Sequence, residues 1–313
     1  MTTIADNTRL LIDLEPVVTE NLNRHLATAK EWMPHEYVPW SLGSDYADLG
    51  GQAWDPAQSR LSALARTALE VNLLTEDNLP SYHRVVERTF GRDSAWGTWV
   101  HRWTAEEGRH AYCIRDYLLV TRGVDPEQLE RARMDVMQIG YDRPEENLLQ
   151  VLAYVSFQEL ATRISHRNTG RYAEDPIAER LLTRVAGDEN LHMIFYRNLV
   201  KAALEISPGL TLRAIADGVL NFQMPGAVIP GFTRKAAEIA KAGIYDLRIH
   251  HDDVIWPLLR HWQVFDLEGV DAEGEQARTE LAAFLTRLDT QASRFEQRRA
   301  QAQAKVVALA PHP

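Results

Sequence analysis

Cysteine, glycine, proline and long apolar runs are all scarce in this 313-residue sequence. Its one cysteine, Cys113, excludes a disulfide within the chain and fits a reducing compartment. The 17 glycines and 14 prolines make up about 10% of the chain, against roughly 12% in average proteins. No run approaches the ~18 apolar residues of a membrane span. These shortages favour a helical protein without membrane spans.

Positive charge is also in short supply. Lysine and arginine number 34 against 44 acidic residues, which gives a net charge of −10 and argues against a nucleic-acid or anionic-membrane binder. The N-terminus does not read as a signal peptide, because Asp6 replaces a basic region and Asp13 and Glu15 interrupt the apolar residues. We therefore expect a cytoplasmic protein that binds no nucleic acid.

Apolar residues recur with the 3.6-residue period of helices, and no stretch alternates convincingly with a period of two. The sequence predicts an all-α fold in one domain over residues 1–303, with a disordered tail at 304–313. Glycines, prolines and capping residues divide the chain into helices. The predicted helices lie around residues 11–26, 57–90, 93–121, 144–169, 176–207, 210–222, 234–262 and 274–303.

The motif Glu-x-x-His occurs twice, as Glu107–His110 and Glu189–His192. Residues three apart lie on one face of a helix, so each pair can offer a carboxylate and an imidazole to one metal. Both pairs interrupt apolar stripes that face the core, where an ionised carboxylate is costly unless it is paired or bound to metal. The interrupted stripes contain Trp96, Val100, Trp103, Ile114 and Tyr117, and Ala178, Leu182, Val185, Tyr196 and Leu199.

A single glutamate precedes each motif by a similar interval. Glu76 lies 31 residues before Glu107, and Glu159 lies 30 residues before Glu189. Four glutamates and two histidines from four antiparallel helices are the ligand set of ferritin-like di-iron or di-manganese bundles. We therefore predict a ferritin-like four-helix bundle with additional surrounding helices. Its predicted metal ligands are Glu76, Glu107, His110, Glu159, Glu189 and His192.

Two further acids, Glu106 and Asp188, each stand directly before the glutamate of one motif. Metal-bound histidines usually donate their other ring N–H to a carboxylate or carbonyl. Repeat symmetry therefore predicts that Asp188 accepts from His110 and that Glu106 accepts from His192. The isolated histidines are interpreted as hydrogen-bonded core residues: His25, His83, His101, His166 and His261.

Several longer segments resemble the soluble acyl-acyl-carrier-protein desaturases, particularly the actinobacterial members. The segments are LTEDNLPSYH at 74–83, WTAEEGRH at 103–110, SFQELATRISHRNTG at 156–170, DENLHMIFYR at 188–197 and FQMPG at 222–226. The resemblance covers about residues 10–265. One departure is Gly108, where the family usually has Asn, but this is not a ligand position.

The resemblance implies a homodimeric enzyme with an oxo-bridged di-iron centre, which inserts a cis double bond into a saturated acyl chain carried on acyl carrier protein. Oxygen is consumed, and electrons come from ferredoxin or a similar donor. The six predicted ligands match the family's iron ligands, and Thr162 matches a hydroxyl beside the oxygen-binding face. Trp32, in the family-like segment EWMPHEYVPW, is expected to extend the Asp188 link towards the surface as a route for electrons. Candidate basic residues for docking the acidic carrier are Arg163, Arg167 and Arg171, or Arg234, Lys235 and Lys241.

Three alternatives stay open at this point. A related di-iron oxygenase could hydroxylate a carrier-bound or free substrate, and the ligands alone do not distinguish it from a desaturase. A ferritin-like ferroxidase would need far fewer residues. A metal-free structural bundle is disfavoured because all six ligand residues are present. Acyl chain length and double-bond position depend on a cavity that no motif encodes.

Overall fold

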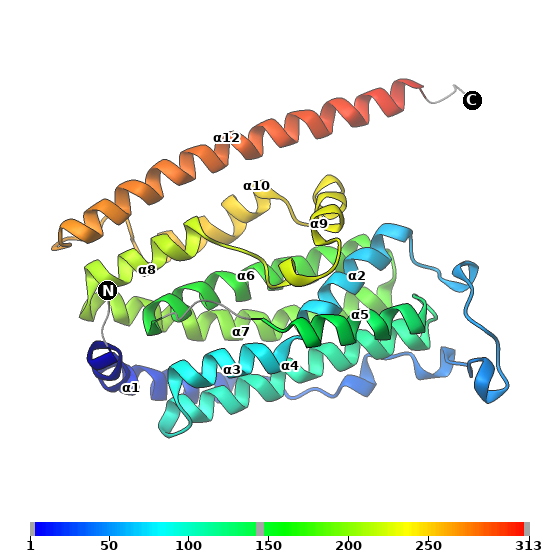
Figure 1. Cartoon of the computed structure of the whole chain (residues 1–313), viewed down its shortest axis with the longest axis horizontal. Coiled ribbons are helices and arrows are strands. Elements are labelled where there is room, and N and C mark those ends of the chain that lie inside the picture. Colours follow the sequence, from blue (N-terminus) through cyan, green and yellow to red (C-terminus); the bar gives the residue numbers. More distant parts are fainter. Residues whose placement is uncertain (1–3, 142–146, 310–313) are drawn as a thin grey trace.

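The computed structural model describes residues 4–141 and 147–309. It contains helices and no strand within those ranges, which confirms the predicted all-α fold. The long helices lie side by side, with α1 on one outer side and α12 on the opposite side (Figure 1). None of the described helices has the length and apolar character that a membrane span needs. The helices are α1 (Ile4–Thr28), α2 (Ala63–Glu76), α3 (Leu79–Phe90), α4 (Ser94–Val120), α5 (Pro126–Ile139), α6 (Leu148–Tyr172), α7 (Pro176–Ile206), α8 (Pro208–Leu220), α9 (Phe232–Lys241), α10 (Leu247–Ile249), α11 (Trp256–His261) and α12 (Ala272–Leu309).

Four of these helices, α2, α4, α6 and α7, form the central bundle. The longest contact is between α6 and α7, while α2 packs against α4 and α6. The short turn before α7 is fixed by Asp175, whose side chain accepts hydrogen bonds from the backbone N–H groups of Ile177 and Ala178. Pro176 takes the first helical position, where a backbone N–H has no partner within the helix. The turn therefore sets α6 and α7 antiparallel.

Additional helices cover the bundle, as the sequence predicts. α1 packs on α4 and α7, α8 covers α6, and α12 lies over α8 on the outside (Figure 1). Leu14 and Val18 of α1 are fully buried against the bundle. Leu26, near the end of the helix, is 48% exposed, whereas His25 is buried. α1 therefore presents an imidazole to the centre of the molecule.

The prediction of a single helix over residues 57–90 is wrong, because two helices, α2 and α3, occupy this segment. α2 ends at Glu76, and α3 has Pro80 in its first turn. A proline has no N–H for the preceding turn and its ring clashes with that turn, so one helix does not run through it. Asp77 at the break is buried and forms a bidentate ion pair with Arg133 of α5. The break places Glu76 at a helix end rather than in a helix middle.

The structure differs from the predicted helices at three other places. α5 is absent from the predicted helices, although Asp125 and Pro126 give it the same start signal that Asp175 and Pro176 give α7. The helix predicted over 234–262 is divided into α9, α10, a π-helical turn at His250–Ile255, and α11. The tail predicted from residue 304 is helical as far as Leu309, and residues 310–313 lie outside the described residues.

Two helical glycines offer a matched test of the packing between α6 and α7. Glycine inside a helix costs about 1 kcal/mol relative to alanine. A Cβ at Gly108 would meet nothing closer than Leu79 at 3.9 Å, whereas a Cβ at Gly170 would lie 3.1 Å from the backbone of Glu179. We expect Gly108→Ala to raise the free energy of unfolding by up to about 1 kcal/mol, and Gly170→Ala to lower it by about 1–3 kcal/mol. Denaturant titration measures the free energy of unfolding of both variants. Equal changes in the two variants would contradict the close contact between α6 and α7 at Gly170.

Candidate metal centre

The central bundle brings the six predicted ligand side chains together, and all six are buried. Their ligand atoms form two groups, in each of which the atoms lie within 4.8 Å of one another. Glu107 and Glu189 belong to both groups, so each of them could hold either of two neighbouring cations. One group consists of Glu76, Glu107, His110 and Glu189, and the other of Glu107, Glu159, Glu189 and His192.

Unpartnered polar atoms face the space between these side chains. Nδ1 of His110, Nδ1 of His192 and one oxygen each of Glu107 and Glu159 have no hydrogen-bond partner. Nδ1 of His192 nevertheless lies 2.7 Å from Oε1 of Glu107, and Nδ1 of His110 lies 3.2 Å from Oε1 of Glu189. Buried polar atoms are seldom left unsatisfied. Four carboxylates and two imidazoles therefore fit two divalent cations in charge and in donor type.

The electrostatics of the carboxyl groups support the same interpretation. Burial and the nearby charges of Glu189 and Glu107 raise the pKa of Glu159 well above its usual value. Burial and the charge of Glu189 also raise the pKa of Glu107. Burial opposes the ionisation of Glu76 as well, but hydrogen bonds from two histidines hold the pKa of Glu76 well below its usual value. Cations between these groups would remove the repulsion that raises the first two pKa values.

Asp188 lies behind His110, on the side away from the two groups. Its Oδ2 accepts from Nε1 of Trp32 at 2.7 Å, from Arg109 at 3.1 Å and from Nε2 of His110 at 3.5 Å. Arg184 pairs with its other oxygen. The ring of Trp32 stacks on His110, with centroids 6.4 Å apart. His110, Asp188 and Trp32 therefore lie next to one another in the predicted order. The hydrogen bond between His110 and Asp188 is the longer of the two bonds in this chain.

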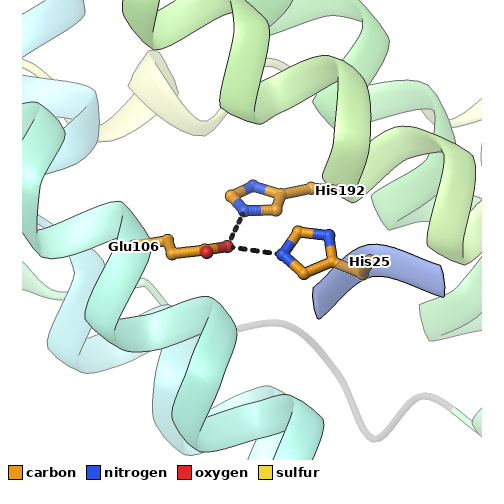
Figure 2. Close-up of side chains that lie close together, drawn as sticks. All are labelled: His25, Glu106 and His192. Carbon is orange, nitrogen blue, oxygen red and sulfur yellow. Dashed lines mark hydrogen bonds and ion pairs between the residues drawn. The ribbon is translucent and has the colours of Figure 1, made fainter. Parts of the chain in front are cut away.

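Glu106 occupies the corresponding place behind His192. Its Oε2 accepts from Nε2 of His192 at 2.9 Å and from Nε2 of His25 at 2.9 Å, as Figure 2 shows. Its Oε1 accepts from Arg102 of the same helix at 2.7 Å. Burial opposes ionisation, but the hydrogen bonds from the two histidines hold the pKa of Glu106 well below its usual value. The His192–Glu106 contact matches the sequence prediction, while His25 was not assigned to the site.

Two of the isolated histidines are buried next to the centre. His166 donates from Nε2 to Oε1 of Glu76 at 2.8 Å, and His25 contacts Glu106. Both lie on the core-facing apolar stripes of their helices. The same kind of position led to the two Glu-x-x-His motifs in the sequence. His101 is exposed, so its assignment to the core is wrong, while His83 is partly buried and bonds to Thr104. His261 is also partly buried.

Thr162 lies on α6, one turn beyond Glu159. Its Oγ1 is 2.5 Å from Oε2 of Glu189 and 3.1 Å from the backbone oxygens of Gln158 and Glu159. A hydroxyl has one hydrogen, and an ionised carboxylate is the stronger acceptor. Thr162 also borders a small cavity whose lining includes Glu76, Met224, Gly226 and Phe232. Its hydroxyl therefore stands between a candidate ligand and a cavity.

An apolar cavity lies on another side of the centre. It measures about 30 Å³, room for about two waters. Trp103 reaches from its wall to the centre, donating from Nε1 to Oε1 of Glu159 at 3.0 Å. Its lining residues include Tyr82, Val86, Val151, Tyr154, Gln158 and Pro225.

The fold and these two groups define a ferritin-like helical bundle with buried carboxylates and histidines that could hold metal. A sequence model described as fatty acid desaturase matches residues 6–309, so the chain belongs to the fatty acid desaturase family. This finding confirms the family that the sequence segments indicate.

Individual relatives agree with the family. The chain is 50% identical over 296 residues to a Mycobacterium tuberculosis protein that carries the name acyl-[acyl-carrier-protein] desaturase DesA1, covering 92% of this chain and 88% of the relative. It is 29% identical over 317 residues to the chloroplastic stearoyl-[acyl-carrier-protein] 9-desaturase 5 of Oryza sativa subsp. japonica, covering 95% and 80%. The X-ray structure of DesA2 from M. tuberculosis H37Rv superposes with a TM-score of 0.71 at 34% identity, over 86% of this chain and 99% of that one.

The overlap of the two groups predicts different losses of metal. Glu189 belongs to both groups, whereas Glu159 belongs to one. We expect Glu189→Ala to lose both metal ions and Glu159→Ala to keep about one ion per chain, measured by mass spectrometric metal analysis after desalting. The exposed Glu127 of α5 supplies the control, since Glu127→Ala should leave the metal content unchanged. Full metal content in Glu189→Ala would remove that residue from the ligand set.

Proposed function

We propose that the protein is an acyl-[acyl-carrier-protein] desaturase that uses a di-iron centre and serves fatty acid biosynthesis. The observation that carries the proposal is the pair of carboxylate–histidine groups sharing Glu107 and Glu189, in a chain of the fatty acid desaturase family. The names of the relatives above supply the substrate class, an acyl chain on acyl carrier protein. Glu76, Glu107, His110, Glu159, Glu189 and His192 would hold the irons.

The reaction requires more than side chains provide. An unactivated C–H bond does not react with any acid, base or nucleophile in the protein, so a metal cofactor must supply the oxidant. The iron pair, when bound, supplies the activation of O₂. Two hydrogens leave neighbouring carbons of the acyl chain, and two further electrons and two protons complete the reduction of O₂ to two waters. A ferredoxin or similar donor is the proposed source of those electrons.

The residues of this chain orient the site and exclude water from it. Trp103 fixes Glu159 by its indole N–H while its ring forms a wall of the apolar cavity. Tyr154, which also lines the cavity, donates to the backbone oxygen of Gln223 in the FQMPG segment. The cavity is too narrow for an alkyl chain as it stands, so an acyl chain would have to displace side chains such as Tyr82 and Tyr154. This displacement would place methylene groups beside the centre without admitting bulk water.

The remaining assignments also belong to this proposal. The partner is an acidic carrier, and the candidate docking residues lie on the last turns of α6 and on α9, where Lys235 pairs with Glu70 at 3.7 Å. Trp32, bonded to Asp188 and in edge contact with Tyr37, offers a route for electrons from the surface. A homodimer in the cytoplasm completes the proposal.

The test of the proposed reaction is product analysis. Reduced, iron-loaded protein is supplied with O₂ and with acyl carrier proteins bearing saturated chains of different lengths. We expect products lighter by two hydrogens, each with one cis double bond, identified by mass spectrometry after cleavage of the thioester. Products heavier by one oxygen would instead identify a hydroxylase, and cage-sized particles on gel filtration would identify an iron-storage protein.

A second expectation concerns the hydroxyl of Thr162. Thr162→Val keeps the shape of the side chain but cannot donate towards Glu189 or towards a ligand in the adjoining cavity. We expect the variant to keep its iron and to lose turnover by roughly 10–100-fold, with more O₂ consumed per double bond formed. Thr162→Ser should restore the coupling, because it restores the hydroxyl. Unchanged turnover with one O₂ consumed per product would contradict the role.

A further inference from the structure

α1 contributes His25 to the polar interior around the candidate metal centre. His25 is 1% exposed, and its Nε2 lies 2.9 Å from Oε2 of Glu106. Its ring stacks on that of His192, with centroids 5.8 Å apart and planes 27° apart, and meets Trp99 edge-on at 5.0 Å. Figure 2 shows His25 of α1 and His192 of α7 converging on one carboxylate oxygen of Glu106 of α4. The imidazole is therefore held on three sides.

The place of His25 corresponds to that of Trp32 on the other side of the centre. Trp32 donates to Asp188, which accepts from His110; His25 donates to Glu106, which accepts from His192. In each case a ring N–H from the N-terminal segment supports the acid behind a candidate ligand. The two rings also stack on the ligand that they serve.

From this arrangement we infer that His25 is a positioning residue, which fixes Glu106 so that Glu106 orients His192 towards one of the two cations. The inference rests on the proposed metal centre. Glu106 is a flexible side chain, and Arg102 holds only its Oε1. His25 fixes the other oxygen, the same atom that accepts from His192. When the ring of His192 carries its proton on Nε2 and donates it to Glu106, Nδ1 carries no proton. This tautomer leaves the lone pair of Nδ1 available to bind a cation.

The same three residues are also close enough to hold an ion of their own. We favour hydrogen bonds, because His192 directs its Nδ1 to Glu107 at 2.7 Å and its Nε2 to Glu106 at 2.9 Å. An ion at each nitrogen would require the ring to lose both protons. A carboxylate oxygen that accepts two N–H groups needs no such step.

The experiment measures release of iron rather than activity alone. Protein loaded anaerobically with Fe²⁺ is mixed with a chromophoric ferrous chelator, and the release of each ion is followed in wild type, His25→Leu and His25→Gln. We expect His25→Leu to release one of its two ions about tenfold faster, at the low end of the ~10–100-fold range for residues behind a ligand. His25→Gln keeps an N–H donor at a similar reach and should release both ions at close to the wild-type rates.

A double substitution tests whether His25 acts through Glu106. If it does, His25→Leu added to Glu106→Gln should release iron no faster than Glu106→Gln alone. His83→Leu, which removes a partly buried histidine bonded to Thr104, is the matched control and should behave as wild type. Circular dichroism and thermal unfolding establish that each variant is folded.

The other outcomes each overturn the inference. Unchanged release in folded His25→Leu would show that Glu106 needs no such support. Faster release of both ions without rescue by His25→Gln would show a general packing role. A third ion in wild type that His25→Leu lacks would make His25 a ligand. A wild-type protein that holds no iron would overturn the metal centre itself, which distinguishes that failure from the first.

Discussion

Repulsion among four carboxylates in one helical interior is the constraint on which the rest of the structure depends. Moving an ionised carboxylate from water into a protein costs several kcal/mol even after relaxation, and here the four come from four different helices. The helices stay close because large apolar side chains pack around the acids; Trp99 stacks on Phe195 with centroids 3.5 Å apart. Packing thus holds the acids together against their charge, and bound cations would turn that repulsion into attraction.

Charge alternates outward from this centre. The inner carboxylates face His110 and His192, and these face Asp188 and Glu106. Three arginines surround the outer acids: Arg109 and Arg184 contact Asp188, and Arg102 contacts Glu106. Each acid therefore meets a donor on both sides, which lets buried charge persist in a chain whose net charge is −10. The imidazoles are held by acids rather than by solvent, so their orientation is fixed before any cation binds.

The metal-ligand candidates could be predicted from the sequence because charged or polar residues interrupt apolar stripes that face the core. Glu107, Glu189 and their histidines interrupt such stripes in two matching pairs, and metal binding explains why acids are buried there. His25 and His166 interrupt similar patterns, but each stands alone, and a lone histidine gives no partner to argue from. Their partners come from helices far away in the chain, and a one-dimensional pattern does not record such contacts.

Helix boundaries and cavities were harder to predict from the sequence. Pro80 and Pro126 mark helix starts that the stronger apolar period around them obscured. The narrowness of the apolar cavity depends on how Tyr82 and Tyr154 pack across it, which no local pattern encodes. The acyl chain length follows from the same packing, so it too lies beyond the motifs.

His25 and Trp32 stand seven residues apart in the chain, ahead of every candidate ligand. Their partners include Asp188 and His192, which leave the ribosome some 160 residues later. α1 can pack on α4 earlier, but the part of its apolar face that contacts α7 stays uncovered until α7 has been made. Its docking joins contacts of very large sequence separation, the kind that form slowly. Docking of α1 on α7 and completion of the centre are consequently coupled, and a nascent chain stalled before α7 would expose that part of α1 to chaperones and proteases.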